Sequence, residues 1–270
     1  MMLKYITIIL SFLLTIFIIS SCTKVIDVDI NEANQRIVID AYVQNYAVDT
    51  TSSFCQVKLT RTGSFYSNNS FEIIKDANLF IKDKDGNSHK LLSYQNGYYN
   101  FMMSPSVEFS DELELHGNIE GEEISAKSVM QRRVKIDSVV ATQLPFGPKN
   151  KGVKPICYFT DFPDEENYYR LVLYVNNIQV GGFFVTYDMS RDGGTIAYPF
   201  MRNPVQKNDT VSVELFGISK FDYDYYKVII QTQSSGGFAA APGNPNTNIE
   251  GNAIGVFTAE SFDKKTIIVQ

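Results

Sequence analysis

The residues of this chain that could bind a metal ion lie together in one acidic segment. Asp161, Asp164, Glu165 and Glu166 fall within six positions, between two stretches that alternate like β-strands. Carboxylate oxygens at close spacing are the ligands that Ca²⁺ prefers in proteins. A solvated acidic turn would have the same composition. These four residues are therefore weak candidates for a metal site, and no metal ligand is assigned.

Histidine and serine, the commonest bases and nucleophiles, do not form a catalytic pattern in this chain. Its two histidines, His89 and His116, stand far apart and have no cysteine or carboxylate at the spacing of zinc ligands. Gly217 and Ser219 resemble the start of a nucleophile elbow, but Phe221 occupies the position of its second glycine. Ser219 is better explained as the cap of a helix. The sequence therefore predicts no catalytic residue, no cofactor and no enzymatic activity.

Cys22 is the residue with a predicted chemical modification. Lys4 provides a positive start, residues 6–19 are almost wholly apolar, and the small Ser20 and Ser21 precede the cysteine. This order is typical of a secretory signal peptide. A cysteine directly after the small residues predicts a bacterial lipoprotein signal, in which the thiol receives a diacylglyceryl group and Cys22 becomes the new N-terminus.

Two other interpretations of the leader remain open. An uncleaved membrane anchor would need about 20 apolar residues, somewhat more than the leader has. Cleavage and export without a lipid is the other alternative. Several acyl chains together would anchor the protein stably, because each buried CH₂ contributes about 0.8 kcal/mol. We treat 1–21 as a lipoprotein signal peptide and 22–35 as a tether.

The charge of the mature chain limits its partners. Removal of residues 1–21 leaves 249 residues, and because Lys4 is the only charged residue in the leader, the formal net charge becomes −7. A nucleic-acid-binding protein would show a basic patch or stripe, which this composition does not favour. It does not favour a basic membrane-binding face either. A mild acidic excess supports solubility and selects no particular partner.

Cys55 and Cys157 remain after Cys22 is assigned to the anchor. Exported thiols can form disulfides, but these two lie in different predicted domains. Two buried thiols on separate strands are the alternative, and the sequence alone does not decide between them.

The fold class follows from the many aromatic and β-branched residues and from the turn signals between short alternating segments. Sixteen Tyr and 19 Phe with no Trp favour β structure. The sequence predicts a mainly β protein with two β-sandwich-like domains. The first, 36–131, has strand spacing typical of an immunoglobulin-like sandwich. The second, 134–270, is rich in strands and contains one helix near the C-terminus.

Individual elements are predicted from periodicity. In the first strand, 36–44, Ile37, Ile39, Ala41 and Val43 share one face. The segment 83–87 is predicted to be a hairpin turn. Two closing strands are expected at 253–260 and 265–269.

One helix is predicted at 219–234. Ser219 and Asp222 have the spacing of a capping box. An apolar stripe is expected at Phe221, Tyr225, Val228, Ile229 and Thr232.

Several segments of the mature chain resemble a known family. They are Cys22 with its acidic tether, Ile37-Val38-Ile39-Asp40-Ala41-Tyr42-Val43, Val57-Lys58-Leu59-Thr60-Arg61-Thr62, 76–79, 85–87, 97–99, Asn167-Tyr168-Tyr169-Arg170-Leu171, Asn248-Ile249-Glu250-Gly251-Asn252 and 255–257. Together they resemble a family of Bacteroidota outer-membrane lipoproteins with a DUF4249-like domain of unknown function. Thr60 stands where the family usually has serine, and Asn252-Ala253 replaces a glycine-rich pair.

The resemblance implies a function rather than a site. Genes of this family often lie beside those of TonB-dependent receptors, and the family provides no catalytic residues to transfer. We therefore expect a lipid-anchored outer-membrane lipoprotein that acts, without catalysis, as an accessory or binding partner of a TonB-dependent nutrient-uptake receptor. The alternative is a free-standing surface lipoprotein or adhesin that binds glycans or peptides. The sequence does not decide which face of the membrane it occupies.

Overall fold

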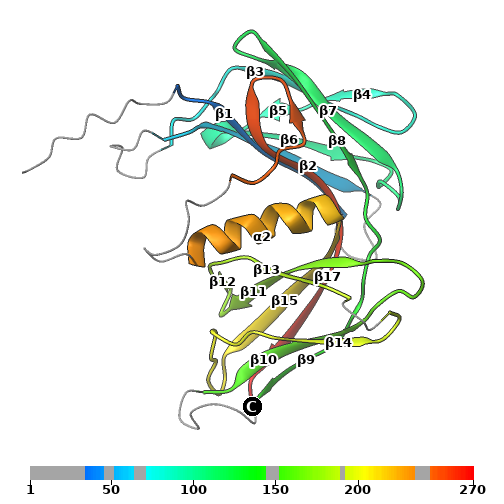
Figure 1. Ribbon diagram of the computed structural model, residues 1–270, viewed down its shortest axis with the longest axis vertical. Helices are drawn as coiled ribbons and strands as arrows, with labels where there is room; N and C mark the ends of the chain where they lie inside the picture. Colours follow the sequence, from blue (N-terminus) through cyan, green and yellow to red (C-terminus); the bar gives the residue numbers. More distant parts are fainter. Residues whose placement is uncertain (1–33, 46–51, 64–70, 144–151, 189–191, 235–243) are drawn as a thin grey trace, which may run out of the picture. The chain divides into compact units, whose positions relative to one another are not determined.

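The fold is known from a computed structural model, which describes residues 34–45, 52–63, 71–143, 152–188, 192–234 and 244–270. The predicted signal peptide and the predicted lipidation site Cys22 lie outside the described residues. Residues 35–270 form one compact unit. That unit is mainly β, with one α-helix near the C-terminus, so the predicted fold class is confirmed (Figure 1). Within the described ranges, no helix combines the length and apolar character needed to cross a bilayer.

A nine-stranded sheet connects the two predicted strand series. Its order is β12-β11-β15-β17-β1-β2-β6-β5, and β13 also pairs with β11. The bounds of its strands are β1 (Ile37–Asn45), β2 (Ser53–Arg61), β5 (Leu92–Ser93), β6 (Tyr98–Met103), β11 (Tyr168–Val175), β12 (Ile178–Gln179), β13 (Phe184–Tyr187), β15 (Thr210–Ile218) and β17 (Ala253–Ile268).

Two smaller sheets complete the fold. The five-stranded sheet has the order β16-β8-β7-β3-β4, and the three-stranded sheet has the order β14-β10-β9. A short 3₁₀ helix, η1 (Gln95–Gly97), joins β5 to β6. The remaining strands are β3 (Ala77–Lys82), β4 (Ser88–Lys90), β7 (Glu112–Ile119), β8 (Glu122–Val129), β9 (Ile136–Thr142), β10 (Lys154–Thr160), β14 (Thr195–Pro199) and β16 (Ile249–Glu250).

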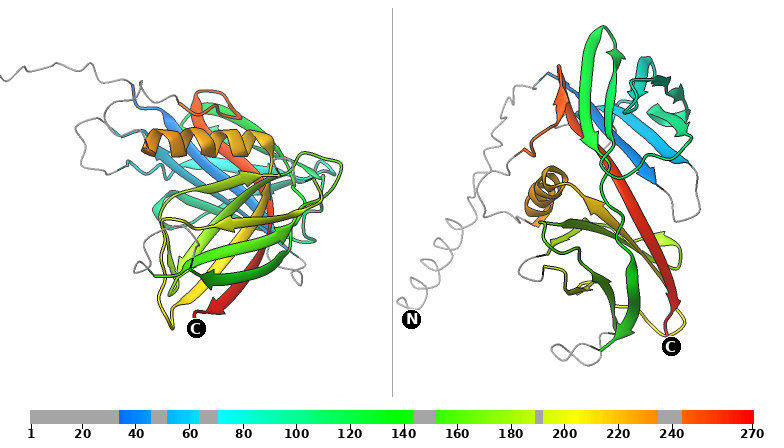
Figure 2. Two further views of the ribbon diagram at one scale, coloured as in Figure 1. Left: turned by 60° about the horizontal axis from the view of Figure 1, so that its bottom comes forward. Right: turned by 90° about the vertical axis from the view of Figure 1, so that its right-hand side faces the viewer.

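The last long strand, β17, holds the large sheet together (red in Figure 1; Figure 2, right). Its first half pairs in parallel with β1, from Ile37 opposite Ala253 to Asn45 opposite Ser261. Its second half pairs antiparallel with β15. The two closing strands expected from the sequence are therefore one continuous strand, because Lys264 and Lys265 interrupt the apolar pattern without ending the pairing.

Strict alternation along the strands builds the first hydrophobic core. Ile37, Ile39, Ala41 and Val43 of β1 are all buried, as their shared face predicts. The buried faces of β2 and β6 join them in one cluster with side chains from the five-stranded sheet. Residues from the end of the chain, including Phe257, belong to the same cluster.

A second core lies in the second strand series and contains Cys157, Phe159, Tyr169 and side chains of β15. The two cores correspond to the two predicted domains except for the C-terminal residues that join the first. The division into two domains stays a prediction, because the nine-stranded sheet continues through both series. An immunoglobulin-like topology is not confirmed for 36–131, since β1 pairs with a strand from the far end of the chain.

The helix α2 (Lys220–Ser234) packs on the large sheet, a point that the sequence left open (Figure 1). Tyr223 and Tyr226 of α2 pack against a third cluster formed by Val172, Phe216, Ile218 and Phe262 of the sheet. The expected stripe differs from this contact face. Phe221, Tyr225, Val228 and Ile229 are half-buried, as Tyr223 and Tyr226 are, but they do not belong to this cluster, and Thr232 is exposed.

Candidate functional site

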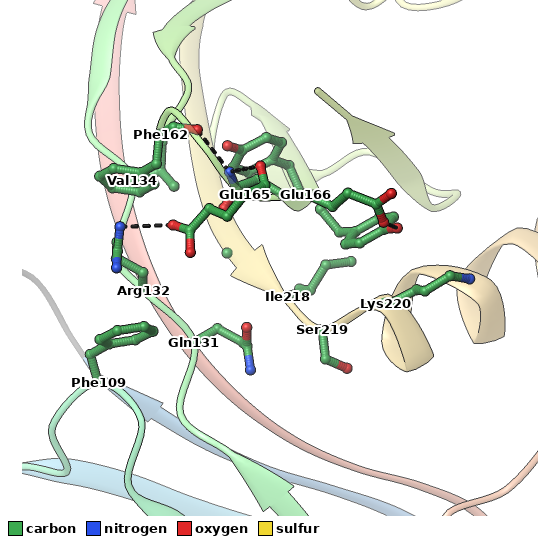
Figure 3. A pocket seen from close by; sticks show the side chains of 14 residues that line it. Phe109, Gln131, Arg132, Val134, Phe162, Glu165, Glu166, Ile218, Ser219 and Lys220 are labelled. Atoms are coloured by element: carbon green, nitrogen blue, oxygen red, sulfur yellow. Dashed lines mark hydrogen bonds and ion pairs between the residues drawn. The ribbon is translucent and has the colours of Figure 1, made fainter. Parts of the chain in front are cut away.

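A cleft of about 390 Å³ lies between the segment that follows β8, the loop that follows β10 and the start of α2 (Figure 3). This volume is within the range of small-molecule sites in proteins. The cleft is lined by charged, amide and aromatic side chains, with no histidine or cysteine among them. The predicted acidic segment contributes Glu165 and Glu166 to its wall.

Arg132 is the central cation of the cleft. Its guanidinium carbon lies 4.6 Å from the ring centre of Phe109 and 4.7 Å from that of Phe162. Its Nη1 lies 2.8 Å from Oε1 of Glu165. Such stacking contributes about 0.5–1 kcal/mol per ring at exposed sites. The sequence places Arg132 between the two predicted domains, 36–131 and 134–270, and no local pattern links it to Phe109 or Phe162.

Asp161, Glu165 and Glu166 of the acidic segment engage separate partners through their carboxylates, whereas Asp164 is held through its backbone. Asp161 is buried and accepts hydrogen bonds from the Tyr169 hydroxyl and from the Gly193 N–H, the latter at 3.2 Å. Glu165 pairs with Arg132, as described above. The Asp164 backbone N–H donates to the side chain of Asp192. These contacts tie the segment to the surrounding loops and strands.

Glu166 is engaged by Tyr168, whose hydroxyl donates to Oε2 at 2.7 Å. This hydrogen bond, together with partial desolvation, raises the pKa of Tyr168 to about 12.

Across the described ranges, no three His, Cys, Asp or Glu side chains come close enough together to hold a metal ion.

Ser219 caps α2, as the sequence predicts. Its hydroxyl donates to Oδ2 of Asp222 at 2.7 Å and accepts the Asp222 backbone N–H at 3.1 Å. The Ser219 backbone N–H also donates to Oδ2 of Asp222, at 3.2 Å. This reciprocal arrangement is a capping box with Asp in the position of the usual Glu. It engages the serine in the helix start rather than leaving it as a nucleophile.

The sheet face beneath α2 carries a buried ion pair between Arg170 and Glu260. Their side chains are 13% and 1% exposed, respectively. The Arg170 guanidinium stacks on Phe216 at 3.9 Å from the ring centre, and Nε2 of Gln44 lies 3.3 Å from the Glu260 carboxylate. Neither residue was singled out from the sequence, because 90 positions separate them.

Asp222 belongs to the same buried environment. Burial raises the pKa of its carboxyl to about 7, and the negative charge of Glu260 adds to this effect. Hydrogen bonds from Ser219 and the positive charge of Arg170 act in the opposite direction. The Asp222 carboxyl of the capping box therefore titrates near neutral pH.

We predict that this titration makes stability fall as pH rises. Because the folded-state pKa of Asp222 lies above its ordinary value, its stabilisation is complete below about pH 4 and is lost as pH rises to about 7. The slope is at most about 1.4 kcal/mol per pH unit. Asp222→Asn should flatten this part of the profile, measured as urea midpoints from pH 4 to pH 8.

The matched control for this prediction is Asp224→Asn. Asp224 lies on the exposed side of the same helix and pairs with Lys220. This variant should keep the wild-type slope. An unchanged slope in Asp222→Asn would contradict the assignment of the titration to the capping box.

The two histidines are structural neighbours of aromatic rings. Nε2 of His89 lies 2.9 Å from Oδ2 of Asp83, and its ring stacks on Phe101. His116 stacks on Phe80, with Nε2 3.0 Å from a serine hydroxyl on β4. The two histidines do not form a common site in the described structure.

The predicted hairpin turn at 83–87 is confirmed. Asp83 accepts the backbone N–H groups of Asp85 and Asn87. Desolvation acts to raise the pKa of Asp83, but hydrogen bonds from His89, Asn87 and Asp85 lower it to about 2.

Cys55 and Cys157 are free, buried thiols on β2 and β10. They belong to the first and second cores, respectively, and no disulfide joins them. Burial raises the pKa of each thiol to about 12, which disfavours the reactive thiolate. Cys22, the predicted lipidation site, lies outside the described residues.

The segments that carried the family resemblance have structural roles in this fold. In the 167–171 segment, Tyr169 is buried against Asp161 and Arg170 pairs with Glu260 beneath α2. In the closing segment, the Asn248 amide bonds both backbone groups of Phe257, at 2.8 and 2.9 Å. These contacts fix loops and strands to one another.

Comparison with family models identifies the family to which the chain belongs. No curated protein matches the chain. The model of the family described as Domain of unknown function (DUF4249) matches residues 23–266, well over half of the chain. The chain therefore belongs to the DUF4249 family.

Proposed function

We propose that this protein is a lipid-anchored outer-membrane lipoprotein that acts, without catalysis, as an accessory or binding partner of a TonB-dependent nutrient-uptake receptor. The observation that carries the non-enzymatic part is the pairing of the charged side chains around the cleft. Arg132 is held by Glu165 and two phenyl rings, and Glu166 is engaged by Tyr168. Groups engaged in this way are suited to positioning a surface for a partner.

The location rests on the leader that ends at Cys22. If Cys22 is lipidated, replacing it with alanine should abolish metabolic labelling by palmitate and move the protein from the membrane pellet to the soluble fraction. Cys55→Ala is the matched control, because Cys55 is a buried core thiol and cannot receive the lipid in the folded protein. Retained label in the Cys22→Ala variant would contradict the lipoprotein assignment.

The receptor partnership is tested by purifying the tagged lipoprotein from native outer membranes in mild detergent. The expected result is recovery of one TonB-dependent receptor in near-equal amount, identified by mass spectrometry. The Cys22→Ala variant serves as the control for capture after lysis. Isolation of the wild-type lipoprotein always as a lone monomer would contradict the partnership.

A free-standing binding lipoprotein or adhesin is the second candidate. The observation that favours it is the presence of aromatic side chains at the surface near the edge of the large sheet. Tyr94 is 66% exposed, and Tyr98 on β6, next to the edge strand β5, is half-exposed. Binding of a glycan or peptide by protein that lacks any receptor would support this candidate.

A further inference from the structure

The outward side chains of β1, β2 and β6 form a regular grid, which we call the outer sheet face. The inward side chains of these strands fill the first core, so the alternate positions lie on the opposite face of the sheet. The strand register sets Tyr42 opposite Gln56, and Gln56 opposite Asn100. One row of the face therefore crosses three strands in line.

Hydrogen bonds connect this middle row. The Tyr42 hydroxyl donates to Oε1 of Gln56 at 3.0 Å, and Nε2 of Gln56 donates to Oδ1 of Asn100 at 3.1 Å. A side-chain amide has two N–H donors and two acceptor lone pairs. The row thus uses one donor and one lone pair of Gln56 and one lone pair of Asn100. Both amides are held in place with hydrogen-bonding capacity remaining.

Rings and apolar side chains border the middle row on both sides. On one side, Lys58 and Tyr98 occupy facing positions, with the Lys58 ammonium 5.3 Å from the ring centre. On the other, Phe54 faces Met102, which is 56% exposed. Aromatic rings offer flat apolar surface at low entropic cost. The face thus presents amides between flat apolar patches.

The charge of the outer sheet face is balanced. Asp40 of β1 lies opposite Lys58 of β2. A site for a polyanion, such as nucleic acid or a phosphorylated headgroup, would need a cluster of basic residues. The balance favours an uncharged ligand whose polar groups are donors and acceptors rather than ions.

The helix α2 lies beside this face on its β17 side. Burial, together with the negative charge of Asp40, raises the pKa of the Tyr225 hydroxyl on α2, so the two side chains are close in space. Gln44 at the end of the grid contacts Glu260 beneath the same helix. A ligand on the face would therefore have the helix along one side.

We propose that the outer sheet face binds a neutral oligosaccharide. The Gln56 and Asn100 amides would contact sugar hydroxyls, and Tyr98 and Phe54 would pack against the apolar C–H faces of sugar rings. The proposal specifies a ligand for the binding role proposed above. It rests on that proposed function only for the location of the protein at the outer membrane. No bond is made or broken, since recognition requires hydrogen bonds and ring contacts alone.

The test is affinity electrophoresis of the detergent-solubilised lipoprotein in native gels that contain a neutral polysaccharide. The probes are glycogen, xylan, galactomannan, laminarin and dextran, one in each gel. We expect retardation in at least one gel. Titration calorimetry with an oligosaccharide prepared from that polysaccharide should show at least a tenfold rise in Kd for Gln56→Ala and for Asn100→Ala.

Gln179→Ala is the matched control, because Gln179 is an exposed amide on β12 at the opposite edge of the same sheet. It should leave the Kd unchanged, and circular dichroism should show all three variants folded. Lack of retardation in every polysaccharide gel, or unchanged Kd in the Gln56 and Asn100 variants, would overturn the proposal.

Two further outcomes separate this inference from the proposals above. Retardation only in a gel containing gelatin would identify a peptide-binding face and overturn the oligosaccharide assignment. Recovery of a receptor with no glycan binding would leave the accessory function standing while this inference fails. Glycan binding with no receptor recovered would support this inference and contradict the accessory function.

Discussion

Gly255→Ala should lower the free energy of unfolding by about 3–5 kcal/mol, a loss at the upper end for single substitutions. Gly255 lies in β17 directly opposite Ile39 of β1. A Cβ atom there would lie 1.8 Å from the Ile39 carbonyl oxygen and 2.7 Å from its carbonyl carbon. Since β1 is enclosed between β2 and β17, its backbone has no room to retreat.

The backbone conformation adds to this cost. Gly255 has φ +127°, a region that L side chains rarely adopt. Gly182→Ala is the matched control, because Gly182 has φ +105° and nothing lies within 4 Å of the position of its Cβ. Urea denaturation followed by circular dichroism would measure both variants. We expect Gly182→Ala to lose about 1–2 kcal/mol from backbone strain alone. Equal losses would contradict the steric argument.

Local patterns predicted the parts of the fold that depend on neighbouring residues. The buried face of β1 follows from a period of two along four apolar side chains. The capping box of α2 follows from the spacing of Ser219 and Asp222. The turn at 83–87 follows from its Asp and Gly residues. Each is decided within seven residues, so the local sequence contains the whole signal.

Pairings between distant residues were not predictable in the same way. The parallel pairing of β1 with β17 joins Ile37 to Ala253, and no local feature of either segment specifies the other. The pair Lys264–Lys265 has the polarity of a turn, but the strand continues because Lys264 pairs with Glu214 on β15. Solvent-facing strand positions tolerate charge. A strand with charged residues at such positions is therefore not recognised from its apolar residues alone.

The candidate cleft shows the same limit. The acidic segment could be recognised from composition, but its partners could not. Arg132 contacts Phe109 in one part of the chain and Phe162 and Glu165 in another. The observed contact face of α2 differs from the predicted one for a related reason. Tyr223 and Tyr226 are the helix residues that pack against the sheet cluster. Helical periodicity considers only the hydrophobicity of each position and does not show where the sheet lies.

Glu260→Ala should also be strongly destabilising, by about 3–5 kcal/mol, because it leaves the Arg170 guanidinium buried without its partner charge. The Glu260 side chain is 1% exposed and that of Arg170 is 13% exposed, so water cannot replace the lost carboxylate. The matched control is Lys127→Ala, which breaks the pair with Glu112 between β7 and β8. Both side chains of that pair are more than half exposed, and its loss should have little effect.

The double variant distinguishes the value of the pair from the cost of an unpaired charge. Arg170→Met alone should destabilise, since Glu260 then remains buried without its partner cation, next to Asp222 and with a hydrogen bond from Gln44. Arg170→Met combined with Glu260→Ala removes both charges and should lose less than the sum of the single variants, by at least about 2 kcal/mol. Additive losses would contradict direct coupling between the two residues. Strong coupling would mean that the ion pair beneath α2 stabilises chiefly by matching two buried charges, so that neither residue can change without the other.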